Sequence, residues 1–565
     1  MNSRKTTALS IGICVVSITL RAAIPTRALS LGLHDDDWMV SNAYWLVNGE
    51  FRRPWTILSM NKELGYPFFL AIARTLQTSP ILLAHLIFVF VSWLLVRVIR
   101  QQMSTSKNLL MLTALVLNPA IFGLTASRIY RDMWTIVLTL SLLILVLNIL
   151  NKPRGNLKIK KLVMVCTLGF ILSLWLRMTR VDTYWVLIVI FVPSIPTIFE
   201  LISRTIKHRR IEIKAVHLGT ALLLASISLG QLIAPHVSSE INSRRYGVNL
   251  SDDFFVGEFS SLFKTWSAIK TTSEVAYTPI NQEQRLVAYG QSPLLQRLEP
   301  QIEGEFSSGW RSISCQATGV CDDIAGGYFA HAVRDAYAYA YPNSNGMQFQ
   351  EFMKNANHEL RMGCNEGEIP CEEAGLNTQL PSLNEIDWLP TFRTAISFVF
   401  NRSLRFNDSI GFDPVRPSDG PHVREWDDFL LSGYGMKHVN LDGTPSWLRS
   451  PIKAIFDLLG WICMASVSIG LISVLILFVP QRRRSIAWLG LGCLAGVGVH
   501  AFVIAIAAQN SMGPLSFNGV WELTYLLQEI PFLIIGGVIG LELLFNTIRN
   551  LPARLNPESR NAGVE

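Results

Sequence analysis

The sequence predicts an all-α polytopic membrane bundle of about ten transmembrane helices with a mixed, mainly helical extracytoplasmic insertion. Half of the 565 residues are hydrophobic and only 16% are charged, and the mean hydropathy of +0.32 is too high for a soluble protein of this size. A bilayer core about 30 Å thick requires ~20 apolar residues per helical span. Ten nearly uncharged runs have about this length: 8–25, 80–98, 108–126, 133–151, 162–178, 183–202, 215–235, 452–480, 486–508 and 521–546.

The first run has an alternative interpretation. Arg4 and Lys5 precede it, as they would in a cleaved signal peptide. No small-x-small cleavage site follows the run, and Arg21 interrupts its end. We therefore favour a retained first span.

Basic residues give the orientation of the chain. They crowd into alternate short loops, namely Arg97, Arg100 and Lys107; Lys152, Arg154, Lys158, Lys160 and Lys161; Arg204, Lys207, Arg209, Arg210 and Lys214; and Arg482, Arg483 and Arg484. The positive-inside rule places these loops and both termini in the cytoplasm. We therefore expect a multi-pass protein of the plasma (inner) membrane with its large loop outside. The net charge of +7 reflects this topology rather than nucleic-acid binding.

The chain divides into four predicted parts. Residues 1–235 form an N-terminal membrane module with seven spans and the candidate catalytic outer loops, and residues 236–450 form an extracytoplasmic domain. Residues 451–547 form a C-terminal membrane module with three spans, and residues 548–565 form a cytoplasmic tail. The first outer stretch, residues 26–79, separates the first two spans. Its segments 36–49 and 66–76 are predicted to form helices along the membrane surface.

Cysteine placement supports this topology. Four cysteines lie together in the large hydrophilic stretch, where an oxidising compartment would preserve disulfides: Cys315, Cys321, Cys364 and Cys371. Four cysteines allow three connectivities. Two local bridges, Cys315–Cys321 and Cys364–Cys371, are the simplest because each pair is close in sequence. A zinc site is the alternative, but neither pair has the C-x₂-C spacing.

Three consecutive aspartates follow the first span, in His34-Asp35-Asp36-Asp37-Trp38. Adjacent carboxylates at a membrane surface can bind a divalent cation, or one of them can act as a base. Neighbouring residues on a helix point in different directions, so at most two of the three should meet one ligand. The structural alternative is a helix N-terminus, where aspartate is favoured.

Two short outer loops each combine two arginines with an aspartate. Their charged residues are Arg128, Arg131 and Asp132 in SRIYRD, and Arg177, Arg180 and Asp182 in RMTRVD. Arginine forks suit phosphate oxygens, which indicates an anion site. Snorkelling to the membrane interface explains isolated arginines of this kind, but it explains two such loops less well.

Other polar residues have mainly structural interpretations. Gly65-Tyr66-Pro67 reads as a turn, while Lys62 just ahead of it is a candidate phosphate contact. Glu529 in the last span is expected inside the bundle, and His500 is interpreted as a packed or surface-seeking histidine. The sequence contains no G-x-x-x-x-G-K-[ST], H-E-x-x-H or G-x-S-x-G motif, which disfavours ATP-driven transport, zinc proteolysis and α/β-hydrolase chemistry.

Taken together, these motifs resemble the GT-C glycosyltransferases. The stretch from HDDDWMV to NKELGYPFFLA, the SRIYRD loop, and the segment from AVRDAYAYA to the second cysteine pair are similar to a bacterial group of GT-C-like membrane proteins. The resemblance implies a polyprenyl-phosphate sugar donor and inversion at the anomeric carbon. It maps the first-loop acid, a base or a ligand of Mg or Mn, to Asp35 or Asp36, and the second-loop acid to Asp132. The third aspartate leaves this register open to Asp37.

The expected function is therefore a membrane hexosyl- or pentosyltransferase. It would move a sugar to an extracytoplasmic glycan, lipid or protein, with Lys62, Arg128, Arg131, Arg177 and Arg180 binding the donor phosphate. The main alternative is an O-antigen ligase or polymerase, which would use a lipid diphosphate, arginines and a large-loop histidine. His331, His358 and His422 are candidates for that histidine. A transporter and a non-catalytic assembly protein are further alternatives.

Overall fold

The computed structural model of the chain is helical wherever it can be described. It describes residues 3–23, 33–60, 62–151, 158–208, 215–272, 275–372, 386–399, 446–481, 485–509 and 526–555. Across these ranges there is no named strand, and the isolated bridge between Ile269 and Cys371 is antiparallel. The predicted all-helical membrane fold is confirmed at this level.

Eight helices in the described ranges are long and apolar enough to cross a membrane. Their apolar segments are Arg4–Ala22, Pro80–Ile99, Asp132–Leu150, Ile159–Thr179, Ala215–Tyr246, Gly460–Leu477, Ile486–Ala507 and Leu527–Arg549. They belong to α1 (Ser3–Ala23), α4 (Pro80–Ile99), α7 (Asp132–Leu150), α8 (Ile159–Thr179), α11 (Ala215–Tyr246), α21 (Ser446–Gln481), α22 (Ser485–Ala507), and η7 (Leu527–Glu529) with α24 (Ile530–Leu555). Each coincides with a predicted span.

The other two predicted spans are interrupted helices, and proline accounts for both. In 108–126, α5 (Thr105–Val116) ends ahead of Pro119, and the Asn118 side chain accepts a hydrogen bond from the Ala120 amide at 2.8 Å. The short η1 (Pro119–Phe122) and α6 (Leu124–Ser127) follow. In 183–202, α9 (Tyr184–Phe191) gives way to η2 (Val192–Ser194) at Pro193 before α10 (Ile195–His208) begins. Proline lacks the amide donor that an uninterrupted helix needs.

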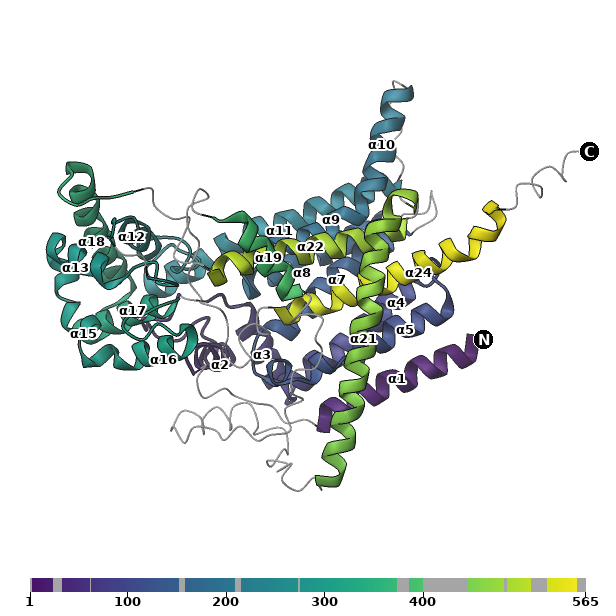
Figure 1. Cartoon of the computed structure of the whole chain (residues 1–565), viewed down its shortest axis with the longest axis horizontal. Coiled ribbons are helices and arrows are strands. Elements are labelled where there is room, and N and C mark those ends of the chain that lie inside the picture. Colours follow the sequence, from purple (N-terminus) through teal and green to yellow (C-terminus); the bar gives the residue numbers. More distant parts are fainter. Residues whose placement is uncertain are drawn as a thin grey trace, which may run out of the picture.

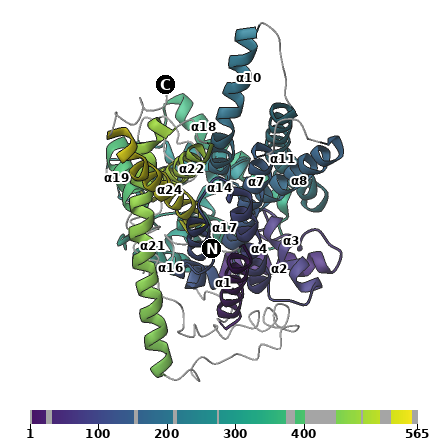
Figure 2. The ribbon, with the colours of Figure 1, turned by 90° about the vertical axis from the view of Figure 1, so that its right-hand side faces the viewer.

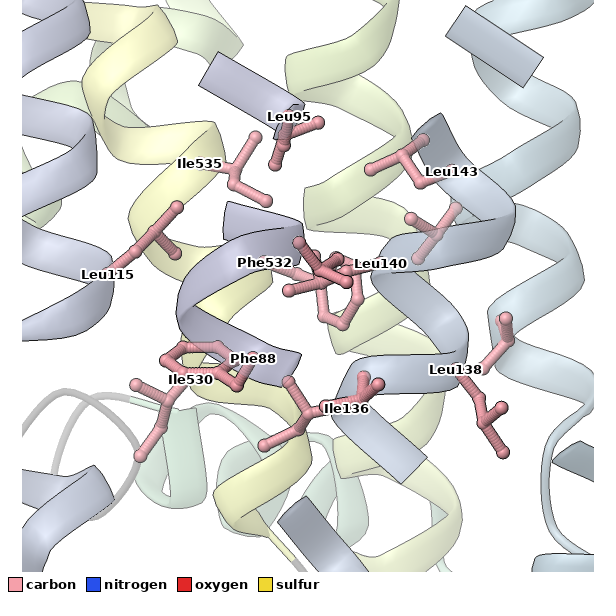
Figure 3. Packing of buried hydrophobic residues seen from close by; sticks show 14 of the residues in the cluster. Phe88, Leu95, Leu115, Ile136, Leu138, Leu140, Leu143, Ile530, Phe532 and Ile535 are labelled. Atoms are coloured by element: carbon pink, nitrogen blue, oxygen red, sulfur yellow. The ribbon is translucent and has the colours of Figure 1, made fainter. Parts of the chain in front are cut away.

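Helix α7 occupies the centre of the membrane bundle. It is apolar on every side, which is the pattern of a helix enclosed by neighbours. Figure 3 shows Ile136, Leu140 and Leu143 of this helix among Phe88 of α4 and Phe532 from the last span. Figures 1 and 2 show α21 crossing the flank of the bundle, where it packs on α24.

The two predicted helices of the first outer stretch are present. They are α2 (Leu33–Val47) and α3 (Gly65–Thr75), and they pack against each other. Helix α2 buries Trp38, Met39 and Ala43, three of the residues that the helical spacing places on one face, whereas Val47 at the end of that face is 44% exposed. Helix α19 (Trp388–Phe398) packs against α22, so the apolar segment 388–400 contacts the membrane bundle.

The domain within residues 236–450, which we call the outer domain after its predicted location, has a hydrophobic core of its own, built from residues 254–371. Its helices are α12 (Glu258–Ser267), α13 (Gln282–Gln291), α14 (Pro293–Gln296), α15 (Glu299–Glu303), η3 (Glu305–Ser307), α16 (Ser308–Thr318), α17 (Tyr328–Ala340) and α18 (Gly346–Glu366). Figure 1 shows them gathered at one end of the membrane bundle. Both predicted disulfides are confirmed, because Cys315 pairs with Cys321 and Cys364 pairs with Cys371.

Candidate functional site

Asp35 lies in the first turn of α2, close to where the outer domain meets the membrane bundle. The N-terminus of a helix favours negative charge, so the aspartates occupy a suitable place. Of the three consecutive aspartates, the structure describes the side chain of Asp35 alone. The predictions for Asp36 and Asp37 concern side chains outside the described part.

Two other outer segments converge on the Asp35 carboxylate. Lys62 Nζ lies 3.3 Å from Asp35 Oδ2, and the two side chains are 21% and 23% exposed. The Tyr130 hydroxyl donates a hydrogen bond to the same oxygen at 3.0 Å. Sequence analysis predicted the meeting of the aspartate, the lysine and this loop, although it did not single out the tyrosine. Partial exposure leaves the carboxylate accessible to a ligand.

Two arginines add positive charge around this carboxylate. The guanidinium of Arg128 lies 4.5 Å from the Tyr130 ring centroid and that of Arg131 lies 5.3 Å from it. Burial alone would raise the pKa of Asp35, but the charges of Lys62, Arg131 and Arg128 outweigh burial and hold that pKa well below its ordinary value. Asp35 is therefore ionised at neutral pH, within a surplus of positive charge.

The backbone around Lys62 is held by close packing and hydrogen bonds. Arg52 donates to the carbonyl oxygens of Ser59 and Lys62 at 3.0 and 3.2 Å. Gly65 lies directly against the end of α8, where an added Cβ would come within 2.5 Å of the Met178 carbonyl carbon. Trp175 also donates its indole N–H to the Gly65 carbonyl at 2.7 Å. Gly65, Tyr66 and Pro67 therefore form the first turn of α3 rather than the separate turn that the sequence indicated, and the packing of Gly65 against α8 positions the lysine.

Glu63, next to this lysine, is a buried carboxyl that sequence analysis did not single out. It is 5% exposed and accepts a short hydrogen bond from the Ser238 hydroxyl of α11. Burial raises the pKa of Glu63 to about 7, and the charge of Asp252 adds to the effect, while Arg52 and Arg177 oppose it. Arg177, a predicted phosphate ligand, thus lies near this carboxyl.

The second and third outer loops are paired through Arg180. Its Nη1 lies 2.7 Å from Asp132 Oδ1, and its Nε and Nη2 donate to the two oxygens of Asp182 at 2.8 and 2.7 Å. Arg180 and Asp132 are 1% and 2% exposed at their side chains. Arg180 therefore pairs with the aspartates of both Arg-Asp loops, for which the sequence indicated an anion site, and Arg128, Arg131 and Arg177 remain as the surplus of positive charge in these loops. The geometry assigns this arginine and Asp132 to holding the loops together.

A buried histidine extends this network into the C-terminal module. His500 Nδ1 lies 2.6 Å from Glu529 Oε1, and its Nε2 lies 3.8 Å from Asp182 Oδ2. The histidine and Glu529 are both 0% exposed. Sequence analysis expected Glu529 inside the bundle, which its burial confirms, and interpreted His500 as a packed or surface-seeking histidine, but it missed their pairing. The available signal was an ionisable residue in each of two apolar spans, which usually marks an interior contact.

The outer domain is anchored to the first outer stretch by hydrogen bonds from both members of a buried ion pair that lies within the domain. Arg334 Nη2 of α17 lies 2.7 Å from Asp253 Oδ1, and both side chains are 0% exposed. Arg334 also donates to the Ile57 carbonyl at 2.7 Å, and the Asp253 amide donates to the Met60 carbonyl at 3.1 Å. These bonds fix α17 against the segment that leads to Lys62.

One histidine of the outer domain has a charge that affects the site. His331, one turn before Arg334 on α17, is among the groups whose charge lowers the pKa of Asp35, after Lys62 and the two arginines. His358 lies exposed on α18, and His422 lies outside the described residues. Of the candidate ligase histidines that can be placed, His331 is the one whose charge affects the pKa of Asp35.

The described residues suit an anion better than a divalent cation. Within the described ranges, no group of three or more His, Cys, Asp and Glu side chains is arranged to hold a metal ion. The one described carboxylate of the aspartate triplet, Asp35, is already paired with the Lys62 ammonium, whose charge would repel a cation. We therefore derive no step through Mg or Mn.

Fold and site together define a class of protein. It is a multi-pass helical membrane protein with a disulfide-bonded outer domain. A cluster of charged side chains around Asp35 lies where that domain meets the membrane bundle. Comparison of the chain with protein-family models, curated proteins and solved structures found no match to any of them. Function is therefore argued from the site.

Proposed function

We propose that the chain is an inverting membrane glycosyltransferase of the GT-C type. It would transfer a sugar from a polyprenyl-phosphate donor to an extracytoplasmic acceptor at a bacterial plasma (inner) membrane. The observation that carries this proposal is the partly exposed, ionised Asp35, to which Lys62 and the Tyr130 hydroxyl bind directly. Arg128 and Arg131 place further positive charge beside the same group.

The proposed reaction uses these charges in two ways. The acceptor oxygen forms a bond to the anomeric carbon of the donor, and the bond from that carbon to the phosphate oxygen breaks. The electron pair of the broken bond leaves with the lipid phosphate, and the acceptor proton passes to Asp35 as general base. In this proposal the anionic donor phosphate draws the charges of Lys62 and Arg131 away from Asp35, which raises the low pKa that otherwise makes this carboxylate a weak base. Lys62 and Arg131 are positioned to stabilise the departing phosphate anion. Attack opposite the leaving group inverts the anomeric centre.

The remaining predicted residues take supporting roles in this proposal. Arg180 directs all three donor nitrogens to Asp132 and Asp182, so the pair Asp132–Arg180 acts by positioning Tyr130 and Arg131 rather than by contacting the donor. Arg128 is 2% exposed and contributes its charge from behind the Tyr130 ring. The phosphate would therefore be bound mainly by Lys62 and Arg131.

A second candidate is supported by His331. An O-antigen ligase-like enzyme would combine arginines with a large-loop histidine and use a lipid diphosphate donor. The effect of His331 on the Asp35 carboxylate is the observation that favours it. The donor separates the two candidates, because the first requires a monophosphate and the second a diphosphate.

The test is sugar transfer in proteoliposomes by the purified full chain. Donors are panels of polyprenyl-phosphate and polyprenyl-diphosphate hexoses and pentoses. Loss of a positioned base typically removes ~10²–10⁴ of rate, so Asp35→Asn should lose this much with the monophosphate donor while keeping the parental melting temperature. Asp322→Asn is the control, because this aspartate is exposed in the outer domain. Parental rates for Asp35→Asn would refute the mechanism, and turnover of diphosphate donors alone would favour the ligase.

A further inference from the structure

Helix α19 packs on a part of α22 that belongs to a membrane-spanning segment. Ala395 and Phe398 of α19 share one hydrophobic cluster with Ala501 and Ile504 of α22. Both α22 residues fall near the end of the apolar segment Ile486–Ala507, which is long enough to cross a bilayer. Figure 1 shows α19 beside α22, in the half of the bundle nearer the outer domain. Helix α19 therefore lies level with the end of this span, at the edge of the bilayer.

Two hydrogen bonds fix how α19 is rotated about its own axis. The Thr391 hydroxyl donates to Gln509 Oε1 at 2.5 Å, and Gln509 Nε2 donates to the Thr394 hydroxyl at 3.0 Å. Gln509 lies just past the end of α22. Thr391 and Ala395, one turn apart, are both buried. This face of α19 therefore points at α22, and the rest of the helix surface points away from it.

The surface of α19 that points away from α22 is divided into an apolar and a polar strip. The apolar strip consists of four large side chains that are 43% to 60% exposed, namely Trp388, Leu389, Phe392 and Ile396. Their spacing of three and four residues places them along one face of the helix. Arg393 and Ser397 are also exposed, and their spacing of four residues places them on the neighbouring face. The exposed residues are therefore sorted by polarity around the helix.

The apolar strip continues onto the exposed surface of α22. The Trp388 ring stacks on the Phe502 ring of α22, with centroids 5.7 Å apart and an interplanar angle of 15°. Val499, one turn before Phe502, is 39% exposed in the same spanning segment. A contiguous apolar strip bordered by charge marks contact with another molecule or with a membrane, and tryptophan is enriched where a membrane meets water. Because this strip joins the surface of a spanning helix, lipid is the partner that fits it.

We infer that α19 is an interfacial helix that binds phospholipid of the leaflet next to the outer domain. Its 11 residues extend about 16 Å, roughly half of the ~30 Å hydrocarbon core, so it cannot cross the bilayer. A helix with one apolar and one polar face lies in the plane of the membrane surface instead. The apolar strip contacts acyl chains, and Arg393 lies among the headgroups, where its guanidinium can pair with a lipid phosphate.

This inference does not depend on the proposed glycosyltransferase function. It assigns residues 386–399 to the membrane-embedded part of the chain, although sequence analysis placed them in the extracytoplasmic domain of residues 236–450. Lipid contact would then hold the chain at the membrane surface between the outer domain and α21.

Spin labelling of the full chain in phospholipid liposomes tests this placement. The cysteines outside the two disulfides are replaced by alanine, and a nitroxide is attached to Phe392→Cys or Arg393→Cys. Oxygen concentrates in lipid and a neutral nickel chelate stays in water, so the collision rates of the label with each show what surrounds it. The label at 392 should collide mainly with oxygen, and the label at 393, on the polar strip, mainly with the nickel chelate.

Two matched controls have nearly the same exposure as Phe392, which is 57% exposed. Phe90→Cys on the spanning helix α4 reports lipid, and Met347→Cys on α18 of the outer domain reports water, since each of these side chains is 56% exposed. If Phe392→Cys does not keep the parental melting temperature, Ile396→Cys on the same strip replaces it. A strip label that behaves like the label at 347 would place the strip in water and overturn the inference. A strip label shielded from both reagents would show that protein covers the strip, and this would overturn the inference equally.

Discussion

Replacing Glu63 with glutamine should stabilise the protein at alkaline pH and remove part of its pH dependence. The carboxyl is 5% exposed, accepts a hydrogen bond from Ser238, and has its pKa raised from 4.5 to about 7 chiefly by burial. Below pH 4.5 the group is protonated in both the folded and the unfolded chain. Between pH 4.5 and about 7 only the folded chain retains the proton, so stability falls as the pH rises through this window. Above about pH 7 the full loss of stability has taken place.

The size of the destabilisation follows from the shift in the pKa of Glu63. One pKa unit corresponds to ~1.4 kcal/mol, so the change from 4.5 to about 7 represents about 3 kcal/mol of destabilisation at pH 8. Glutamine has nearly the same shape and carries no charge, and its amide oxygen can accept the Ser238 hydrogen bond. The free energy of unfolding of Glu63→Gln should therefore exceed that of the parent by about 3 kcal/mol at pH 8 and by much less at pH 5.

The assay is thermal unfolding of both proteins in the same detergent at pH 5, 6, 7 and 8. The melting-temperature difference between Glu63→Gln and the parent should grow with pH and level off above pH 7. Glu366→Gln supplies the control, since Glu366 is exposed at the end of α18 and should show no such growth. An equal or lower melting temperature for Glu63→Gln at pH 8 would refute the reasoning.

Three further changes test packing, anchoring and topology. Gly65→Ala should lower the melting temperature by forcing a methyl group into the backbone at the end of α8, at a cost of ~1–3 kcal/mol; an unchanged value would contradict this close approach. Arg334→Met should cost ~3–5 kcal/mol because it leaves the Asp253 carboxylate buried and unpaired; a further Asp253→Asn change should recover part of the loss, and no recovery would contradict the pairing. Single cysteines at Asn249 and Asn156, in a background without native cysteines, should react with an impermeant maleimide on intact cells at 249 and not at 156; the reverse pattern would invert the proposed topology.

Sequence predicted the parts of the fold that depend on local composition. Eight of the ten predicted spans coincide with long apolar helices because apolar length is visible along the chain. The two disulfides were also predictable, because the two cysteines of each pair lie close together in the sequence. The interruptions at Pro119 and Pro193 were visible as residues, yet the apolar runs around them hid the breaks.

The sequence predicted which segments form the candidate site, but it did not predict most of the pairs that their charged side chains form. Three outer segments carried unusual charges, and the structure brings Asp35, Lys62 and Tyr130 together. Which arginine would neutralise which carboxylate depends on how the spans are arranged, so the pairing of Arg180 with Asp132, 48 residues away, could not be predicted. The bond between Arg334 and Asp253 spans 81 residues inside the outer domain, and although Arg334 lies in the AVRDAYAYA segment, no motif indicated Asp253 as its partner.

The contact of His500 with Glu529 has a consequence for how the protein is made. Spans enter the membrane in order from the N-terminus, so Asp182 and Arg180 are in place long before the ribosome reaches the final helix. The imidazole of His500 is inserted next, and its carboxylate partner comes from the last span to be synthesised. A nascent chain stalled before that span would expose an unsatisfied polar group to lipid. Stable assembly of this network should therefore require the span that carries Glu529, and a chain truncated before that span should be subject to membrane proteolysis.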